Sequence, residues 1–235
     1  MSAPQLPADA ALLLDLDGTL LDIAPTPDAV VVPAGLLDDL ATLRRRLGGA
    51  LAVISGRPIG QVDALLGDAP RAVAGEHGAA VRHAPQAPIC RASLPEIPHS
   101  WLEEAGRLAA ARPGVLLERK QASFVLHYRL APAEGPALLA ALQALAGEAA
   151  DRFTVMSAHM AWEVKPRGVD KARAVAALMG RAPFAGRRPV YIGDDVTDED
   201  GMRAARALGG LGWRVQDVFT DAAGVRAWLS RLAGR

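Results

Sequence analysis

A short apolar segment near the start of the chain runs directly into two carboxylates and a glycine. The sequence Leu-Leu-Leu-Asp-Leu-Asp-Gly-Thr-Leu occupies residues 12–20. A short apolar run that ends in charge and glycine predicts a buried parallel strand, which delivers its last side chains to the carboxyl edge of a sheet. Open α/β sheets bind ligands at that edge. The segment therefore predicts an α/β fold with a ligand site beside Asp15 and Asp17. On the motif alone, an ordinary turn between strand and loop is the alternative.

The order of apolar strand, polar tip and helix recurs along the chain. Leucines at helical spacing predict a helix over residues 36–47, opened by Pro33 and closed by Gly48. This repetition favours a parallel, doubly wound, Rossmann-like α/β sheet. The further predicted strands are residues 50–54, 71–77 and 189–192, and the further predicted helices are residues 59–66 and 168–179, before a final strand and helix.

The middle of the chain has a different texture. A Pro-rich stretch begins near residue 85, and a helix is predicted over residues 101–112. The strands that follow, over residues 115–120, 123–129, 153–157 and 160–165, alternate polar and apolar side chains, which is typical of an antiparallel sheet with one solvated face. Ser123, His127 and Arg129 are expected on the polar face. We therefore predict an inserted α/β cap over residues 87–164 and a core formed by residues 1–86 and 165–235.

The composition restricts the kinds of partner that the protein is expected to bind. The chain has 26 Lys plus Arg and 26 Asp plus Glu, so its net charge gives no indication of nucleic-acid or membrane binding. Residues 1–7 lack the basic flank and apolar run of a secretory signal, and no run reaches transmembrane length, so a cytoplasmic protein is expected. A monomer is expected as well. The single cysteine, Cys90, excludes an internal disulfide. The chain has three lysines, Lys120, Lys165 and Lys171. Their scarcity beside arginine indicates that they stand at positions where a compact ammonium is needed.

The strand tips carry the groups that phosphoryl transfer through an aspartyl intermediate requires. Asp15 is the expected nucleophile and Asp17 the expected general acid and base. Ser55 and Lys171 are expected to bind the transferring oxygens. Asp15, the backbone carbonyl of Asp17, and Asp194 are the predicted ligands of Mg²⁺.

Two acidic residues beyond Asp194 are weaker candidates. Asp195 and Asp198 are expected to support the metal site, and whether Asp198 touches the metal directly stays open. A solvated helix start is the alternative for Asp198 and Asp200, because carboxylates suit helix N-termini.

Taken in order, these residues resemble the four motifs of the haloacid dehalogenase superfamily of phosphatases. More specifically, the chain is similar to the trehalose-6-phosphate phosphatases over nearly its whole length. The resemblance implies a Rossmann-like core, an inserted cap that closes over a sugar, and Mg²⁺ as the cofactor. The segments that carry the resemblance are residues 15–19, 53–57, 75–78, 126–129, 163–168, 171 and 193–199.

The same resemblance assigns roles to further residues. Gly56 is implied in phosphate binding, and a grip on the sugar is implied for Glu118, Lys120 and Glu163. Arg57, His77 and Arg129 are also implied as substrate contacts, although a histidine is more often structural. The chain departs from the family pattern at Ala172 and over residues 214–222, where glycines are expected.

The expected activity is therefore Mg²⁺-dependent hydrolysis of trehalose 6-phosphate in trehalose biosynthesis. A small sugar phosphate is the expected partner, with no nucleic acid and no membrane. One alternative is a phosphatase for another sugar phosphate, such as sucrose phosphate. An alternative of another class is a catalytically silent module that binds a sugar phosphate or docks onto a synthase.

Overall fold

Two separated segments of the chain form one seven-stranded sheet in the computed structural model. The structure describes residues 4–24, 29–120, 122–158 and 160–235. The strand order is β11-β10-β1-β2-β3-β4-β5, in which the first five strands are parallel and the last two pair antiparallel. The strands are β1 (Ala10–Leu14), β2 (Leu51–Ile54), β3 (Ala72–Gly75), β4 (Ala80–Arg82), β5 (Cys90–Arg91), β10 (Arg188–Gly193) and β11 (Leu211–Arg214).

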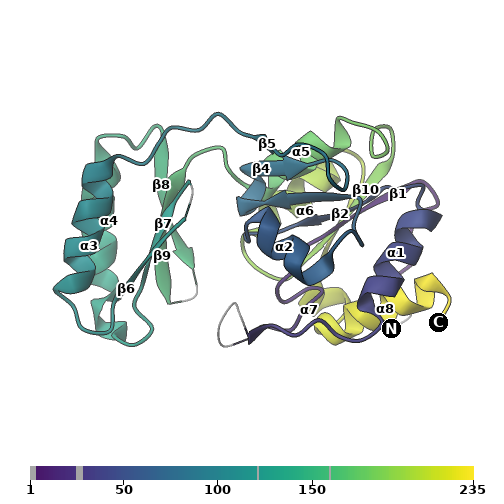
Figure 1. Ribbon diagram of the computed structural model, residues 1–235, viewed down its shortest axis with the longest axis horizontal. Helices are drawn as coiled ribbons and strands as arrows, with labels where there is room; N and C mark the ends of the chain where they lie inside the picture. Colours follow the sequence, from purple (N-terminus) through teal and green to yellow (C-terminus); the bar gives the residue numbers. More distant parts are fainter. Residues whose placement is uncertain (1–3, 25–28, 121, 159) are drawn as a thin grey trace. The chain divides into compact units, whose positions relative to one another are not determined.

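Helices connect the parallel strands, as a doubly wound sheet requires. They are α1 (Leu36–Arg46), α2 (Ile59–Leu66), α5 (Lys171–Met179), α6 (Asp198–Ala207), α7 (Val215–Val218) and α8 (Ala222–Ala233), with a 3₁₀ turn η2 (Glu76–Gly78). Helix α1 packs beside α8 and α5 packs beside α6 (Figure 1). The leucine stripe of α1 is buried as predicted, and every residue of β1 and β2 is buried. The predicted parallel, doubly wound sheet is therefore confirmed.

The residues between β5 and α5 form a four-stranded antiparallel sheet in the order β6-β7-β9-β8. Its elements are β6 (Leu116–Arg119), β7 (Phe124–His127), β8 (Phe153–Ala158), β9 (Ala161–Pro166), α3 (His99–Ala110), α4 (Gly135–Gly147) and the 3₁₀ turn η3 (Pro132–Glu134). Helices α3 and α4 lie on one side of this sheet (Figure 1). Phe124, Leu126 and Val164 face them in the small core. The predicted inserted antiparallel sheet is thus present.

Two expectations about element ends are wrong. Strand β7 ends at His127, so Arg129 lies in a turn, exposed, and is not part of the polar strand face. Strand β3 ends at Gly75 because Glu76 and His77 adopt positive φ angles of 53° and 55°, which no extended strand can contain.

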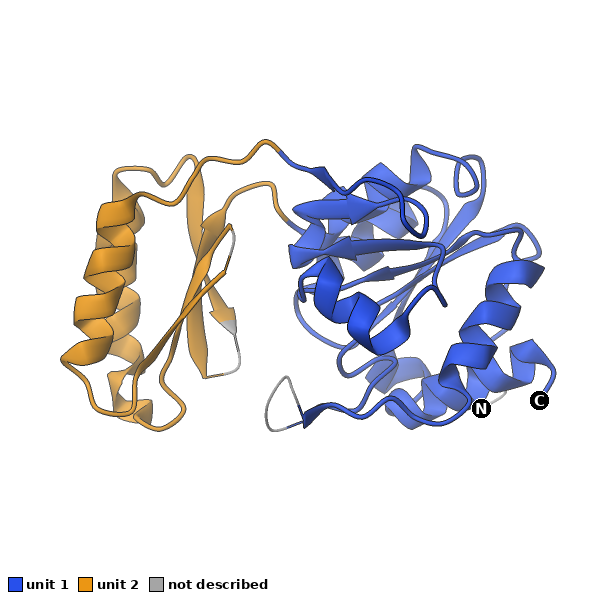
Figure 2. Cartoon of the chain, viewed as in Figure 1, with its two compact units in different colours: residues 1–92, 170–235 blue, residues 93–169 orange. Residues whose placement is uncertain are grey.

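The chain divides into two compact units, here called unit 1 (residues 1–92 and 170–235) and unit 2 (residues 93–169) (Figure 2). The predicted boundaries, 87 and 164, fall a few residues earlier. Two strands account for this difference, since β5 still pairs with β4 in unit 1 and β9 continues to Pro166 in unit 2.

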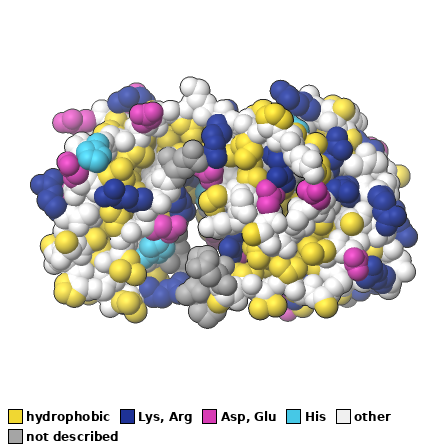
Figure 3. Space-filling view, viewed as in Figure 1, with side chains coloured by type: hydrophobic (Ala, Val, Ile, Leu, Met, Phe, Trp, Pro, Cys, Tyr) yellow, Lys and Arg dark blue, Asp and Glu magenta, His cyan; other side chains and the backbone are white. Residues whose placement is uncertain are grey.

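The surface of each unit mixes both signs of charge. On the face seen in Figure 3, Lys and Arg side chains are interspersed with Asp and Glu side chains. Among the described residues, no helix combines the length and the apolar character needed to cross a bilayer.

Candidate active site

Three neighbouring parallel strands bring their polar tips to one edge of the unit 1 sheet. Strand β1 lies between β10 and β2, and the three end at Gly193, Leu14 and Ile54. The residues that follow them are Asp194, Asp15 and Ser55, and the edge therefore collects the side chains expected from the sequence. Asp15 and Ser55 are almost completely buried.

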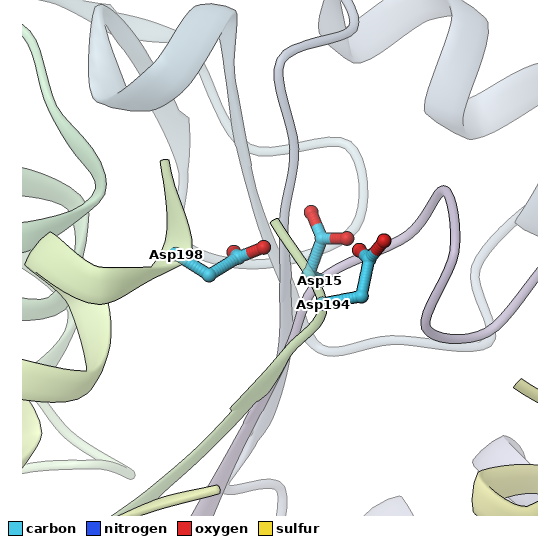
Figure 4. Close-up of side chains that lie close together, drawn as sticks. All are labelled: Asp15, Asp194 and Asp198. Carbon is cyan, nitrogen blue, oxygen red and sulfur yellow. The ribbon is translucent and has the colours of Figure 1, made fainter. Parts of the chain in front are cut away.

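Three carboxylates form an acidic cluster at this edge. One oxygen each from Asp15, Asp194 and Asp198 lies within 4.8 Å of the others (Figure 4). Burial, together with the nearby Asp198 carboxylate, raises the pKa of Asp15 well above its usual range. The same two causes, burial and then Asp198, raise the pKa of Asp194. This charge crowding is what a divalent cation relieves, and an all-oxygen donor set suits Mg²⁺.

Lys171 is the cation that partly neutralises the cluster. It opens α5, whose first turn is capped by Asp170, the side chain of which accepts a hydrogen bond from the Arg173 amide. The buried Nζ donates to Asp15 Oδ1 at 2.6 Å and to Asp198 Oδ1 at 2.5 Å. Burial by itself lowers a lysine pKa, but these two carboxylates outweigh it and hold the pKa of Lys171 above its ordinary value. Lys171 is therefore charged and fixed beside the expected nucleophile.

Asp198 is held by three groups of the protein. Besides Lys171, the hydroxyl of Tyr191 donates to its Oδ1 at 2.7 Å, and the amide of Asp195 donates to its Oδ2 at 3.0 Å. Asp198 is fully buried, so the alternative of a solvated helix start is excluded for this residue. Asp195 itself is exposed, its carboxylate bonds the neighbouring Val196 amide, and it contributes to the cluster through its backbone.

Sequence reasoning missed Tyr191. Burial, and then the Asp198 carboxylate, raise the pKa of its hydroxyl, which therefore stays a proton donor. A signal was available, because a tyrosine inside a buried apolar strand needs a partner for its hydroxyl. The nearest later carboxylates are those of residues 194–200.

Small residues give the carboxylates their places. A Cβ at Gly18, whose φ is +84°, would lie 2.2 Å from Asp194 Oδ2. A Cβ at Gly193 would lie 2.2 Å from Asp198 Cγ. Thr19, which is fully buried, donates its hydroxyl to Asp194 Oδ1 at 3.4 Å. The glycine that follows Asp17 is therefore required by the position of a carboxylate from a distant strand.

Asp17 is not one of the three clustered carboxylates and pairs with an arginine. Arg57 Nε donates to Asp17 Oδ2 and Arg57 Nη2 donates to Asp17 Oδ1, both at 2.7 Å. This fork fixes the plane of the carboxylate. The backbone of Arg57 is held as well, because its amide donates to Ser55 Oγ at 3.1 Å. The structure thus pairs Asp17, the expected general acid and base, with Arg57, an implied substrate contact.

His77 lies against Gly56, because a Cβ at Gly56 would be 2.7 Å from the His77 ring. The amide of His77 donates to the Ser55 carbonyl at 3.0 Å. Glu76 and His77 both occupy the left-handed region, an uncommon arrangement for residues other than glycine. Such backbone cost is tolerated where the surroundings fix a side chain, and here it directs the imidazole toward the Ser55–Gly56 turn.

The remaining candidates lie in unit 2. Glu118 and Glu163 share one face of its sheet, because both pair with Val125 in the strand register. Lys120 Nζ lies 3.3 Å from Glu163 Oε1. The hydrogen bond between His127 and Glu118 lowers the pKa of Glu118 against the opposing effect of burial, and Lys120 adds to the lowering.

These groups can carry out nucleophilic displacement at phosphorus. Asp15 presents a carboxylate beside a fixed ammonium, Ser55 adds a buried hydroxyl, and Asp17 stands two residues further along. A cation bound by the acidic cluster would remove the repulsion between these carboxylates and an anionic substrate.

Comparison with known proteins assigns a family. The model of the family described as trehalose-phosphatase matches residues 13–224. The chain is 42% identical over 205 residues to a probable trehalose-phosphate phosphatase of Sinorhizobium fredii, covering 87% of this chain and 77% of that protein. It is 38% identical over 240 residues to trehalose-6-phosphate phosphatase of Escherichia coli, covering 98% and 84%.

Solved structures share the fold at lower identity. The C-terminal domain of the C. albicans trehalose-6-phosphate phosphatase superimposes with a TM-score of 0.76 at 21% identity, covering 96% of this chain and 92% of that one. A Synechocystis sucrose-phosphatase superimposes with a TM-score of 0.57 at 14% identity, covering 95% and 97%. A haloacid dehalogenase-like hydrolase of Bacteroides thetaiotaomicron superimposes with a TM-score of 0.65 at 13% identity, covering 94% and 98%. The fold is thus that of haloacid dehalogenase-like proteins, a Rossmann-like core with a cap.

Proposed function

The chain belongs to the trehalose-phosphatase family, and we propose that it hydrolyses trehalose 6-phosphate to trehalose and phosphate as a step of trehalose biosynthesis. The observation that carries this proposal is the Asp15 carboxylate, buried at a strand tip between Lys171 and the carboxylates of Asp194 and Asp198. That arrangement supports a phosphatase that uses a carboxylate nucleophile and a metal.

The acidic cluster supports Mg²⁺ as the cofactor. The proposed ligands are the carboxylates of Asp15 and Asp194 and the backbone carbonyl of Asp17. Asp198 is proposed to support these ligands without direct contact with the metal, because Lys171 and Tyr191 already occupy its Oδ1. When bound, the cation supplies charge neutralisation between the carboxylates and the phosphate oxygens.

The residues then divide the reaction into two steps. An oxygen of Asp15 attacks phosphorus, and the bond between phosphorus and the sugar oxygen breaks. Asp17 gives its proton to that leaving oxygen, which departs as a sugar hydroxyl. In the second step Asp17 takes a proton from the water that attacks the aspartyl phosphate, and Asp15 is released with inorganic phosphate. Ser55, Gly56 and Lys171 hold the transferring oxygens through hydroxyl, backbone amide and ammonium.

The pairing of Asp17 with Arg57 bears on the first step. Both oxygens of Asp17 accept hydrogen bonds from Arg57. Arg57 must release one of these oxygens before Asp17 can carry a proton to the leaving group. Because Arg57 is also a proposed substrate contact, exchange of its partner from Asp17 to the substrate couples binding with the readiness of the acid.

Unit 2 is the proposed sugar-binding cap. Glu118, Lys120 and Glu163 offer two carboxylates and an ammonium on one sheet face, a set that suits hydroxyl groups and not an apolar ligand. His77 and Arg129 are the further proposed substrate contacts, although Arg129 lies in a turn. Residues 1–86 and 165–235 remain the proposed phosphatase core and residues 87–164 the proposed cap. The expectations that the protein is monomeric and cytoplasmic stay predictions.

Phosphate release across a panel of sugar phosphates, with and without Mg²⁺, tests the proposal. The kcat/KM for trehalose 6-phosphate should be at least about tenfold higher than that for sucrose 6-phosphate or glucose 6-phosphate, because the site is built to hydrogen-bond particular hydroxyls. Addition of a chelator should abolish turnover. Equal efficiency across the panel would refute the substrate assignment.

The variant Asp15→Asn tests the mechanism in the same assay. It keeps the shape of the side chain and removes the nucleophilic charge, so turnover should fall by at least about a thousandfold. The control is Asp151→Asn, which changes an exposed carboxyl in the turn before β8 and should leave turnover unchanged. A variant at Asp15 that turns over at the wild-type rate would exclude the aspartyl intermediate. Saturable sugar-phosphate binding by wild-type protein without any Mg²⁺-dependent phosphate release would instead favour the binding module.

A further inference from the structure

Strand β7 lies between two strands that each carry a glutamate on the same face of the unit 2 sheet. Glu118 of β6 and Glu163 of β9 both stand opposite Val125 in the register. Two interstrand spacings therefore separate the glutamate backbones, roughly 10 Å. Val125, which is buried, lies between them. The face thus carries a glutamate on either side of a buried valine.

The central strand also supplies a hydrogen bond to each of the two glutamates. Ser123, directly before β7, donates its hydroxyl to Glu163 Oε1 at 2.6 Å. His127, the last residue of β7, has Nε2 at 2.8 Å from Glu118 Oε2. Each is the diagonal neighbour of the glutamate that it contacts, at a separation that long side chains bridge. The two contacts point outward from one strand in opposite directions.

Each contact engages one carboxylate oxygen. Glu163 Oε1 also receives Lys120 Nζ at 3.3 Å, so both of its protein donors reach the same oxygen. Within the part of the chain that the structure describes, Glu163 Oε2 and Glu118 Oε1 receive no hydrogen bond. An ionised carboxylate accepts through both oxygens. One oxygen of each glutamate is therefore available to a ligand hydroxyl.

We propose that Ser123 and His127 are positioning residues, which fix Glu163 and Glu118 so that the second oxygen of each accepts a hydrogen bond from a sugar hydroxyl. The inference rests on the proposed function. A glutamate side chain loses rotamer freedom when it binds a ligand, and a hydrogen bond that already restrains it lowers that cost. Ser123 and His127 therefore act on sugar affinity through the two glutamates.

Kinetic constants for two substrates separate this role from a structural one. Trehalose 6-phosphate carries the sugar, whereas p-nitrophenyl phosphate does not, and both report the same phosphoryl chemistry. Loss of a residue that positions sugar-binding carboxylates should change the kinetic constants for trehalose 6-phosphate alone. The inhibition constant of trehalose against p-nitrophenyl phosphate hydrolysis measures sugar binding independently of the KM.

Ser123→Ala should raise the KM for trehalose 6-phosphate roughly five- to tenfold, which lies in the usual range for the net loss of one hydrogen bond. The kcat, and both constants for p-nitrophenyl phosphate, should stay within about twofold of wild type. Ser123→Thr restores the hydroxyl and should restore the KM. Ser157→Ala is the matched control, because Ser157 is exposed and shares the opposite face of the same sheet with Trp162.

His127→Leu should raise the same KM by a similar factor, and His127→Gln, which keeps an N–H donor, should recover most of the loss. His99→Leu is the control, since His99 is exposed on α3 and pairs with Glu103. The trehalose inhibition constant should rise in parallel with the KM in both loss variants.

The outcomes distinguish this inference from the proposed function. Loss variants that keep the wild-type KM and the wild-type trehalose inhibition constant would overturn the inference, and so would an equal loss on both substrates. If wild-type protein prefers a different sugar phosphate, the proposed substrate is wrong. The inference still holds in that case if Ser123→Ala and His127→Leu raise the KM for the preferred sugar phosphate.

Discussion

The hydroxyl of Tyr191 is the residue-scale feature with the clearest energetic consequence. It is buried against Asp198 and donates at 2.7 Å to the same oxygen that Lys171 contacts. Without that donor, Lys171 alone would compensate the buried charge on this oxygen. A buried carboxylate that loses a partner pays a desolvation cost, and this cost decides the effect of removing the hydroxyl.

Tyr191→Phe should lower the free energy of unfolding by about 1.5–3 kcal/mol, the range for a hydrogen bond to a charged group. Urea denaturation measures it. Tyr128→Phe removes the hydroxyl of the other tyrosine, whose ring stacks on Trp162, and should change the free energy by less than about 0.5 kcal/mol. Equal losses in the two variants would show that the bond to Asp198 contributes nothing specific.

The raised pKa of Asp15 predicts a pH dependence of stability. A carboxyl with a raised folded-state pKa binds its proton more tightly in the folded protein than in the unfolded chain. Its contribution to the free energy of unfolding therefore declines as pH rises from about 4, the ordinary aspartate range, through the raised pKa. In the presence of a chelator, Asp15→Asn should become progressively more stable relative to wild type over that interval.

Urea denaturation at several pH values, for wild type and Asp15→Asn side by side, measures this difference. The comparison cancels the contributions of those carboxyls that do not interact with Asp15. Added Mg²⁺ should reduce the difference, because a bound cation stabilises the folded wild type. A difference that is independent of pH would contradict the raised pKa. Asp151→Asn serves again as the control for loss of an exposed carboxyl.

Residue types at strand tips could be predicted from the sequence, but their partners could not. Asp15, Ser55 and Asp194 follow apolar runs, and parallel strands bring such positions to one edge whatever the loops do. The contact between Arg57 and Asp17 depends instead on side-chain directions in two loops 40 residues apart. No periodicity encodes that pairing.

At the scale of elements, helix α6 reaches strand β10 only because Gly201 has no side chain. A Cβ there would lie 2.5 Å from the Tyr191 ring. This close approach also sets the position of Asp198, the first residue of α6. The helix is thus placed by a glycine on one of its faces.

Gly201→Ala should therefore destabilise the protein by about 1–3 kcal/mol, the usual cost of overpacking a core. Gly106→Ala is the matched control in α3, where an added Cβ meets nothing within 4 Å. That change should stabilise by about 0.5–1 kcal/mol, because alanine is the better helix former. Thermal unfolding of the two variants compares them directly. Shifts of the same sign and size would show that the Tyr191 contact does not restrict α6.

Elements with a clear hydrophobic period were predictable, and short ones were not. The leucine stripe of α1 and the alternation in β7 and β9 each follow one face. Strands β4 and β5 add three and two residues antiparallel to the sheet, too few for any pattern to show. Their pairing depends on the edge that β3 offers, which the sequence does not display.

At the scale of the whole molecule, unit 1 is built from two segments separated by the complete sequence of unit 2. Doubly wound topology makes this possible, since β3 and β10 need no direct connection. The sequence predicted the insertion from its change of texture. Its predicted boundaries lie a few residues before those of unit 2, because β5 and the end of β9 show no such change.

That discontinuity orders events during synthesis. A ribosome adds roughly 5–20 residues per second, so about 10 to 40 s separate the emergence of Asp15 from that of Asp198. Strand β1 leaves the ribosome with its edge toward β10 unpaired, and unit 2 is complete before that partner exists. The nascent chain therefore carries Asp15, the proposed nucleophile, before Lys171 and the rest of the acidic cluster have been made. During this interval, the unpaired apolar edge of β1 has to be covered temporarily by another component of the cell.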